Sequence, residues 1–271
     1  MRIRRRIWAR LWVSATIVFM ACQSQVDPEA ERNRRLVRQL LLKELRPVTL
    51  KNCSFKRFGS PNDGGYVMCE NLNANVESAY SYGIGGNDDW GCEISSTYLV
   101  PVHQYDCFNL PLLGCKGGQF VPHAECVGPR TEIIDSRPFD TISNQISKNG
   151  DAGKRLVVKM DVEGAEWESL LTTPDEVLER IDQLAMELHG VSEPRFLELV
   201  QKLKRNFFVV HIHFNNWACA GNVGPFPANV YQILLVNKRI GVVGTLEPVA
   251  VTARAYDAPD NPMGQDCQLP P

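Results

Sequence analysis

Three carboxylates, Asp161, Glu163 and Glu166, stand within six residues of one another. The apolar run LVVKM precedes them and the run WESLL follows, so this stretch closes a predicted strand and opens a predicted helix. Glu166 alone would be explained by its favourable position at a helix N-terminus. Because neighbouring carboxylates repel one another, the whole cluster indicates that these groups have partners in the folded protein.

A glycine-rich turn is the second candidate site, with Gly83, Gly85 and Gly86 directly after a predicted strand and before a predicted helix. Glycines let the backbone turn sharply and approach a ligand closely. Asp106 stands about twenty residues further on, where nucleotide-binding α/β folds place an acid that accepts hydrogen bonds from ribose hydroxyls. The strict G-x-G-x-x-G spacing is missing, so an ordinary turn and an exposed strand-end Asp stay open as alternatives.

Histidines form the third group. His189 follows Glu187 at the end of a predicted strand, the edge where α/β sites lie, so it is a candidate catalytic base or acceptor-binding residue. A loop histidine in solvent is the alternative. His211 and His213 share one face of another strand, and such pairs more often pack than ligate, so we expect no bound metal. A divalent ion between these two histidines and Asp161 or Glu187 is the alternative.

The elements that would position these residues alternate between short apolar runs and helical patterns. Strands are predicted at residues 78–82, 102–107, 119–127, 155–160, 183–188, 207–214 and 230–236. Helices are predicted at residues 30–45, 89–99, 139–148, 174–181 and 193–206. This interleaving predicts an α/β fold with a largely parallel sheet and helices on both faces.

Composition excludes several classes of protein. With 271 residues and 44% hydrophobic side chains, the chain can bury one substantial core, which excludes disorder over most of its length. Lys and Arg number 29 against 31 Asp and Glu, a balance that argues against nucleic acid as a partner. No apolar run reaches the roughly 18 residues of a membrane span, which excludes a polytopic membrane protein.

The N-terminus has the order of an export signal. Residues 1–22 contain five arginines, no acid, and the uncharged run 11–22. Phe-Met-Ala-Cys, ending at Cys22, resembles a bacterial lipoprotein processing site. We therefore expect an exported protein, associated with a membrane through this leader only. A cytoplasmic protein with a basic amphipathic N-terminus is the alternative. An amphipathic lead-in segment at 23–49, a main domain at 50–240 and a C-terminal tail at 241–271 follow the leader.

Cysteine usage agrees with export, because eight cysteines remain without Cys22 and could form four disulfides. They lack the paired C-x-x-C spacing of a zinc site. Eight cysteines allow 105 pairings, so the connectivity stays open. Near neighbours such as Cys115 and Cys126 are preferred, with Cys219 and Cys267 holding the tail.

The stretch KMDVEGAEWESLL, residues 159–171, resembles the K-x-D-V-E-G-x-E signature of the FkbM-type S-adenosylmethionine-dependent methyltransferases. The likeness extends over about residues 50–240, and its segments resemble the animal and bacterial methyltransferase-like branch of this family. Its further segments are RFG at 57–59, DGGYV at 63–67, YGIG at 82–85 with Glu93 beyond it, Asp106, FDTI at 139–142 and MELH at 186–189.

The resemblance implies a Rossmann-like class I methyltransferase fold, with a seven-stranded, mainly parallel sheet and S-adenosylmethionine across the carboxyl ends of its first strands. Gly83, Gly85 and Gly86 would face the methionine part of this cofactor, and Asp106 its ribose. Asp161 would lie near the sulfonium and the acceptor, where a carboxylate favours the positive charge and could accept the proton of an acceptor hydroxyl.

The chain also departs from the family pattern at two places. Extra acids follow the glycine turn at residues 87–90, and Gln232 stands where relatives often have an acid. The expected acceptor is a sugar or another small hydroxyl compound, and residues 215–217 are a candidate lip of its site.

Three functions stay open from the sequence. The first is O-methylation of a small-molecule or glycan acceptor, with Asp161 and His189 as candidate catalytic residues. The second is a noncatalytic, membrane-anchored binding module on the same scaffold. The third is another nucleotide-dependent enzyme such as an oxidoreductase, which the missing G-x-G-x-x-G spacing disfavours.

Overall fold

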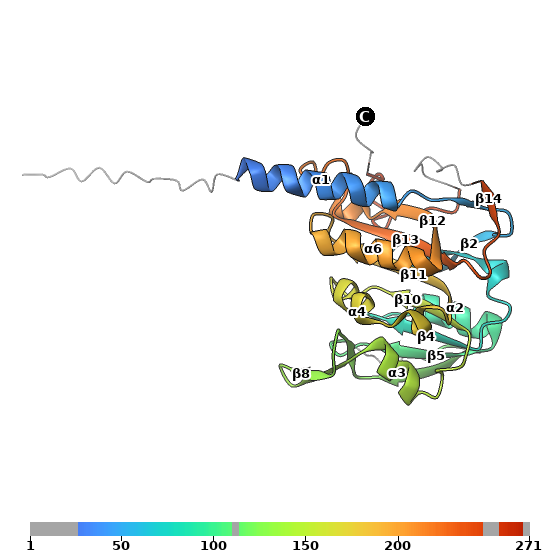
Figure 1. The fold of residues 1–271 in the computed structure, drawn as a ribbon. Helices are drawn as coiled ribbons and strands as arrows, with labels where there is room; N and C mark the ends of the chain where they lie inside the picture. Colours follow the sequence, from blue (N-terminus) through green and yellow to red (C-terminus); the bar gives the residue numbers. More distant parts are fainter. Residues whose placement is uncertain (1–26, 110–113, 246–254, 268–271) are drawn as a thin grey trace, which may run out of the picture.

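The computed structural model describes residues 27–109, 114–245 and 255–267. Its centre is a seven-stranded sheet in the order β12-β13-β11-β10-β4-β5-β6 (Figure 1). These strands are β4 (Ser78–Tyr82), β5 (Pro101–Tyr105), β6 (Gln119–His123), β10 (Leu156–Met160), β11 (Ile181–His189), β12 (Phe207–Phe214) and β13 (Val230–Asn237). The pairs from β11 through β10, β4 and β5 to β6 are parallel, whereas β13 is antiparallel to both β11 and β12. The predicted α/β fold with a mainly parallel seven-stranded sheet is confirmed, and it is compatible with a Rossmann-like arrangement.

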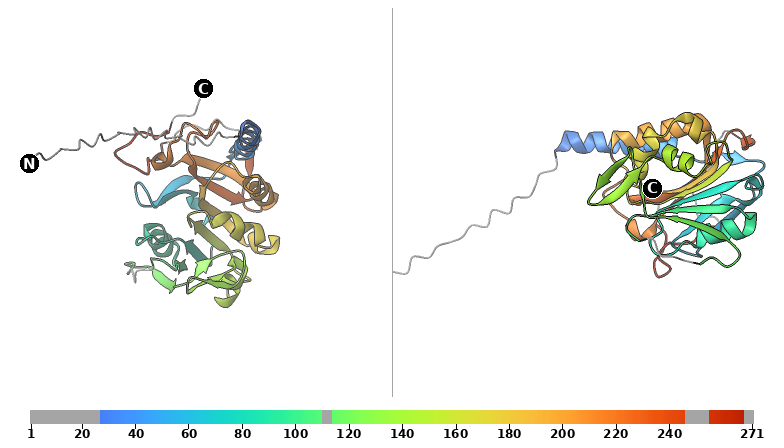
Figure 2. Two further views of the ribbon diagram at one scale, coloured as in Figure 1. Left: turned by 90° about the vertical axis from the view of Figure 1, so that its left-hand side faces the viewer. Right: turned by 90° about the horizontal axis from the view of Figure 1, so that it is seen from below.

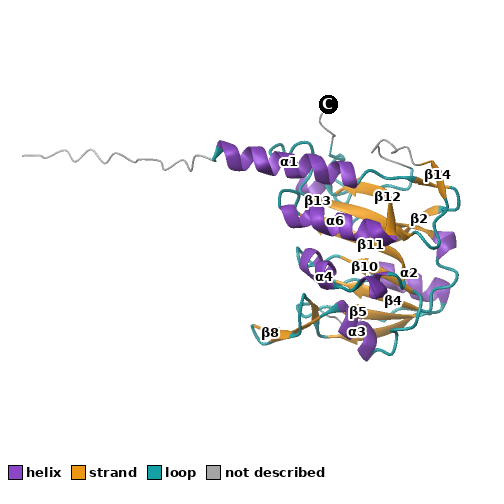
Figure 3. Cartoon of the chain, viewed as in Figure 1, coloured by secondary structure: helices purple, strands orange, loops and turns teal. Residues whose placement is uncertain are grey.

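Helices cover both faces of this sheet (Figures 2 and 3). They are α1 (Pro28–Glu44), α2 (Asp89–Tyr98), α3 (Ile142–Lys148), α4 (Glu166–Thr172), α5 (Asp175–Leu178) and α6 (Pro194–Asn206). Two single-turn 3-10 helices, η1 (Glu70–Leu72) and η2 (Asn216–Ala218), lie in loops. One face packs against α1, α3, α4, α5 and α6, and the other against α2 and a β-hairpin.

Successive side chains of each strand point to opposite faces of the sheet, and this alternation produces one hydrophobic core on each face. In β10, Leu156, Val158 and Met160 pack with the buried residues of the larger helical layer, whereas Val157 packs with those of α2 and the hairpin. Trp167 of α4 stacks on Phe196 of α6 with ring centroids 3.9 Å apart, which joins two helices of the larger layer. Strands buried on both faces explain why their sequences read as continuous apolar runs.

The hairpin of β2 (Phe55–Gly59) and β3 (Gly65–Cys69) was not among the strands predicted from the sequence. A buried glutamine of β11, Gln183, attaches it to the sheet. Its side chain accepts a hydrogen bond from the Cys69 backbone N–H (2.8 Å) and donates to the Cys69 carbonyl (2.9 Å) and to Asn73 Oδ1 (2.5 Å). The amide therefore pairs with β3 as a neighbouring backbone would.

Smaller pieces complete the fold. The lead-in helix α1 packs on α6, and β1 (Thr49–Leu50) pairs with β14 (Val243–Thr245). A three-stranded sheet contains β7 (Cys126–Val127), β8 (Glu132–Ile134) and β9 (Arg137–Asp140). The predicted strand 119–127 is therefore two strands in different sheets. The predicted helix 139–148 begins only at Ile142, because residues 139–140 belong to β9 and pair with β7. The predicted helix 174–181 is shorter, because β11 begins at Ile181.

Four disulfides connect Cys53 with Cys69, Cys92 with Cys115, Cys107 with Cys126, and Cys219 with Cys267. The expected link of the tail through Cys219 and Cys267 is confirmed. The expected Cys115–Cys126 pair is wrong, because β6 separates these two cysteines. Cys115 precedes β6 beside α2, and Cys126 follows it beside the end of β5. Four disulfides indicate an oxidising, exported environment.

The described part of the chain contains no helix that is long and apolar enough to cross a membrane. The expected leader, including Cys22, lies outside the described residues. The tail after β14 is described at 255–267, where it has no helix or strand.

Replacing Gln183 with Met keeps the side-chain length but leaves the buried backbone groups of Cys69 without their partners. We expect Gln183→Met to lower the free energy of unfolding by about 2 to 4 kcal/mol in urea titrations with the disulfides intact. The exposed Gln39→Met on α1 is the matched control and should change it by less than about 0.5 kcal/mol. A Gln183→Met protein as stable as wild type would show that the amide does not hold the hairpin.

Candidate functional site

The strand order creates a crevice between β4 and β10. From β4 the chain continues outward through β5 and β6, and it then returns on the other side of β4 to form β10 and β11. In open α/β sheets such a reversal leaves a ligand crevice outside the carboxyl ends of the strands. A cavity of about 940 Å³ lies at this edge, lined by the loops that follow β4, β5, β10 and β11.

The glycine turn forms one wall of the cavity. Gly83 has a φ of +78°, and a Cβ there would lie 1.6 Å from the carbonyl oxygen of Asp161, so only glycine fits. Gly85 and Gly86 also have positive φ, and a Cβ on either would meet no atom within 4 Å. Gly83 therefore allows the contact between the loops after β4 and β10, and Gly85 leaves open space on the cavity side. Gly86, although also a candidate from the sequence, does not line the cavity.

Asp106 lies at the end of β5 and lines the cavity, as its spacing predicted. One carboxylate oxygen accepts from the N–H groups of Ile84 (2.9 Å) and Gly85 (3.1 Å). The other oxygen accepts from those of Phe108 (2.7 Å) and Asn109 (2.8 Å). Burial opposes ionisation of Asp106, but these four N–H groups together lower its pKa. Asp106 thus shapes the glycine turn, a role that its spacing in the sequence did not indicate.

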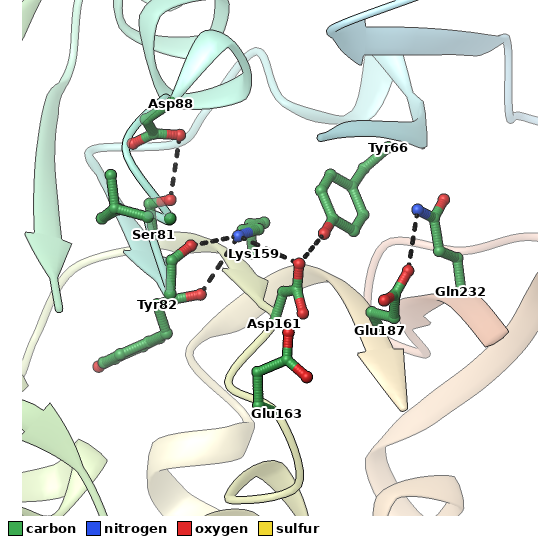
Figure 4. A network of polar contacts seen from close by, with 12 residues as sticks. Tyr66, Ser81, Tyr82, Asp88, Lys159, Asp161, Glu163, Glu187 and Gln232 are labelled. Atoms are coloured by element: carbon green, nitrogen blue, oxygen red, sulfur yellow. Dashed lines mark hydrogen bonds and ion pairs between the residues drawn. The ribbon is translucent and has the colours of Figure 1, made fainter. Parts of the chain in front are cut away.

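Asp161 follows β10 directly and lies between two residues that the sequence analysis did not single out (Figure 4). Its Oδ2 accepts a hydrogen bond from the hydroxyl of Tyr66 in β3 (2.9 Å) and lies 3.8 Å from Lys159 Nζ. The buried Lys159 ammonium also donates to the carbonyls of Gly83 and Tyr82. Lys159 thus links the glycine turn to Asp161, and the hairpin, through Tyr66, positions that carboxylate.

His189 ends β11 and lies among carboxylates. Its Nδ1 is 3.0 Å from Oε1 of the fully buried Glu166, which also accepts from the His189 backbone N–H (2.8 Å). Its Nε2 faces Glu163 (3.3 Å), Glu187 (3.6 Å) and Asp161 (4.0 Å). Burial alone would lower the pKa of His189, but Glu166, Glu187 and Asp161 raise it to about 9. The structure therefore places both candidate catalytic residues, Asp161 and His189, in one cluster.

The acids of the first motif occupy different environments. Glu166 also accepts from the Gly164 N–H (2.9 Å) and thereby organises the start of α4. Glu163, at a φ of +54°, has a largely exposed side chain, 87% accessible. The repulsion that the sequence indicated is thus relieved by burying one acid against His189 and leaving another in solvent.

Gln232 connects the site to the C-terminal tail. Its Nε2 donates to Glu187 Oε2 (3.3 Å) and to Oδ1 of the buried Asp260 (3.1 Å). Burial, together with the charges of Asp161 and Asp260, raises the pKa of Glu187 to about 8. Burial and the charge of Asp63 raise the pKa of Asp260 to about 7. An acid is thus present beside Gln232 after all, and the tail supplies it.

The candidate acceptor lip and the strand histidines separate in the structure. Asn215 donates to both carboxylate oxygens of Glu187, and the exposed Trp217 lines the cavity, so both belong to the site. His211 and His213 do not line this cavity. They face Asp257 (2.7 Å) and Asp266 (3.4 Å) of the tail instead. The structure therefore separates them from the cluster around Asp161.

Acidic groups dominate the cavity wall. They are Asp63, Asp88, Asp89, Asp106, Asp161, Glu163 and Glu187, whereas the basic groups are Lys159 and His189. Lys159 is engaged with backbone carbonyls, and Glu166 lies behind His189. The cavity consequently favours a cationic ligand over an anionic one.

Searches against protein-family models, curated proteins and solved structures find no match for this chain. The family resemblance of residues 159–171 therefore stays a prediction, and the function has to be argued from the site.

Asp260 gives the site a pH dependence that one substitution can isolate. Its folded-state pKa of about 7 exceeds the ordinary 3.8, so the fold favours the neutral carboxyl over the carboxylate. The stability that the neutral form contributes is fully present below pH 3.8 and is lost as the pH rises through about 7. Asp260→Asn stays neutral at every pH. Between about pH 4.5 and about pH 8, we expect the free energy of unfolding of Asp260→Asn to gain on the order of 2 kcal/mol relative to wild type. Urea titrations at the two pH values measure this difference, and parallel pH profiles would show that Asp260 is ionised in the fold.

Proposed function

We propose that this protein is an S-adenosylmethionine-dependent methyltransferase of the FkbM type, acting on a hydroxyl of a sugar or another small acceptor. One observation carries the proposal. The crevice at the reversal of strand order joins a glycine turn with open backbone to a cavity wall of predominantly acidic groups. The methyl donor carries a positive sulfonium and a positive amino group, so this charge balance favours it.

The residues fit the donor. Gly85 lines the cavity and leaves room for its methionine part, since no atom lies within 4 Å of a Cβ at this position. Asp106 holds the loop in that shape through four backbone N–H groups, and a ribose hydroxyl would share its carboxylate from the cavity side. The donor supplies the methyl group, and the chain orients it across the ends of β4 and β5.

At the other end of the cavity, Asp161 and His189 stand beside the place for the acceptor. Tyr66 and Lys159 hold one oxygen of Asp161, which leaves the other oxygen toward the cluster with His189. A hydroxyl that receives a methyl group must lose its proton, and Asp161 is positioned to accept it. The exposed ring of Trp217 offers a stacking surface for a sugar.

The same charge balance argues against the two other functions. A nicotinamide dinucleotide would bring a negatively charged pyrophosphate to this acidic wall. A noncatalytic binding module would not require Asp161 and His189 to meet at the acceptor end of the cavity. We propose export with membrane association through the leader, which requires that the compartment imports the methyl donor.

Calorimetric titration of the full chain, expressed under oxidising conditions, tests the proposal with S-adenosylmethionine, S-adenosylhomocysteine and NAD. We expect the first two to bind and NAD not to bind. An amide at position 106 cannot serve four N–H donors, so Asp106→Asn should weaken donor binding at least tenfold. The half-buried Asp175→Asn on α5, which pairs with Arg205 and precedes β11 at the opposite sheet edge, should leave binding unchanged. A folded wild-type protein that binds neither adenosyl compound would refute the proposal.

Turnover separates the enzyme from the binding module. With sugars and small phenols as acceptors, we expect Asp161→Asn to lower kcat at least about 100-fold, because it loses the proton acceptor, and to change donor affinity less than fivefold. Full activity of Asp161→Asn would remove Asp161 from the chemistry. Donor binding without methyl transfer to any acceptor would favour the noncatalytic module.

A further inference from the structure

Three side chains of the described residues bring one donor atom each to a common point. The ligand atoms of Asp161, Glu187 and His189 all lie within 4.8 Å of one another. His189 Nε2 is 3.6 Å from Glu187 Oε1 and 4.0 Å from Asp161 Oδ1. We propose that this divalent-ion triad, Asp161, Glu187 and His189, binds one divalent metal ion inside the cavity.

The second polar atom of each triad residue is held from behind by a residue outside the triad. Tyr66 donates to Asp161 Oδ2, and Gln232 donates to Glu187 Oε2. Glu166, which is fully buried, holds His189 Nδ1. The inward atoms are Asp161 Oδ1, His189 Nε2 and Glu187 Oε1, and the last of these also accepts a hydrogen bond from Asn215 (3.3 Å). Partners of this kind orient the ligands of protein metal sites, and a carboxylate behind a ligating imidazole is a recurrent form.

Geometry permits an ion of ordinary size. Oxygen and nitrogen atoms bound to one Mn²⁺ or Mg²⁺ at about 2.1 Å are roughly 3 to 4 Å apart. The separations of 3.6 and 4.0 Å to His189 Nε2 fall in this range. All three residues sit at the ends of adjacent parallel strands, β10 and β11, which fixes their backbones relative to one another.

Composition of the triad selects the class of ion. Two carboxylates with one imidazole suit Mn²⁺ and Mg²⁺ better than the thiolate-seeking metals, since all eight cysteines of the described residues are in disulfides. Lys159 does not take the place of the ion, because it approaches Asp161 from the Oδ2 side and donates to the carbonyl of Gly83. Three protein ligands leave positions of a six-coordinate ion open toward the cavity.

An ion here would define the class of acceptor. A hydroxyl oxygen in an open position would lose its proton more readily, and the proton would pass to the exposed Glu163 beside His189 and on to solvent. Asp161 and His189 would then serve the acceptor as ligands of the ion, in place of Asp161 acting as the base. This role rests on the proposed function, whereas binding of the ion does not. The acceptor would be a molecule whose hydroxyl or neighbouring oxygens can coordinate a hard cation.

Titration of Mn²⁺ into the full chain, after treatment with EDTA and its removal, tests the triad by calorimetry and by the electron paramagnetic resonance signal of free Mn²⁺. We expect one Mn²⁺ per chain and competition by Mg²⁺. Glu187→Gln should weaken Mn²⁺ binding at least tenfold, because it removes a ligand and preserves the size of the side chain. Thermal denaturation of each variant checks that it is folded.

Glu198→Gln is the matched control, because it makes the same change at an exposed position of α6 that does not line the cavity. It should bind Mn²⁺ within threefold of wild type. Absence of saturable Mn²⁺ binding by folded wild type would overturn the proposal, and so would binding that Glu187→Gln leaves within threefold. Those results would mean that the side chains around the triad balance its carboxylates without an ion.

Donor binding measured in EDTA keeps the two proposals apart. Mn²⁺ binding without binding of S-adenosylmethionine would support the ion site and refute the proposed function. Donor binding in EDTA with no Mn²⁺ site would do the reverse.

Discussion

The convergence of acidic side chains at one edge of a parallel sheet is the constraint on which the rest of the site depends. Parallel strands end at the same edge, so Asp106, Asp161 and Glu187 meet there although they are far apart in sequence. Like charges so close are costly unless partners offset them. The protein offsets them in several ways: four backbone N–H groups on Asp106, Tyr66 and Lys159 at Asp161, and Gln232 with Asn215 at Glu187.

Peripheral elements are placed to supply these partners. The β2–β3 hairpin, attached to β11 by Gln183 and closed by the Cys53–Cys69 disulfide, carries Tyr66 to Asp161. The tail, held by Cys219–Cys267, carries Asp260 to Gln232. Disulfides therefore hold the two segments that reach the site from outside the sheet. This arrangement connects the oxidising environment that the cysteines indicate with the geometry of the cavity.

Much of the scaffold could be predicted from the sequence because its strands are buried on both faces and read as apolar runs. Local pattern failed where tertiary pairing decides the structure. Residues 119–127 look like one continuous strand in the sequence. The chain nevertheless leaves the main sheet after His123, and residues 126–127 pair with β9 in another sheet. The Cys115–Cys126 pairing failed for the same reason, since nearness in sequence does not show which strands become neighbours.

The sequence by itself determined the α/β class, the even set of cysteines, the glycine turn and the carboxyl-edge positions of Asp106, Asp161 and His189. These features depend on residue type, spacing and alternation, which are local properties. Only the tertiary structure decided that Glu187 joins Asp161 and His189, that Glu166 lies behind His189, and that Tyr66 and Asp260 arrive from the hairpin and the tail. Those contacts depend on which strands pair and on which segments the disulfides hold, and no local pattern in the chain encodes that choice.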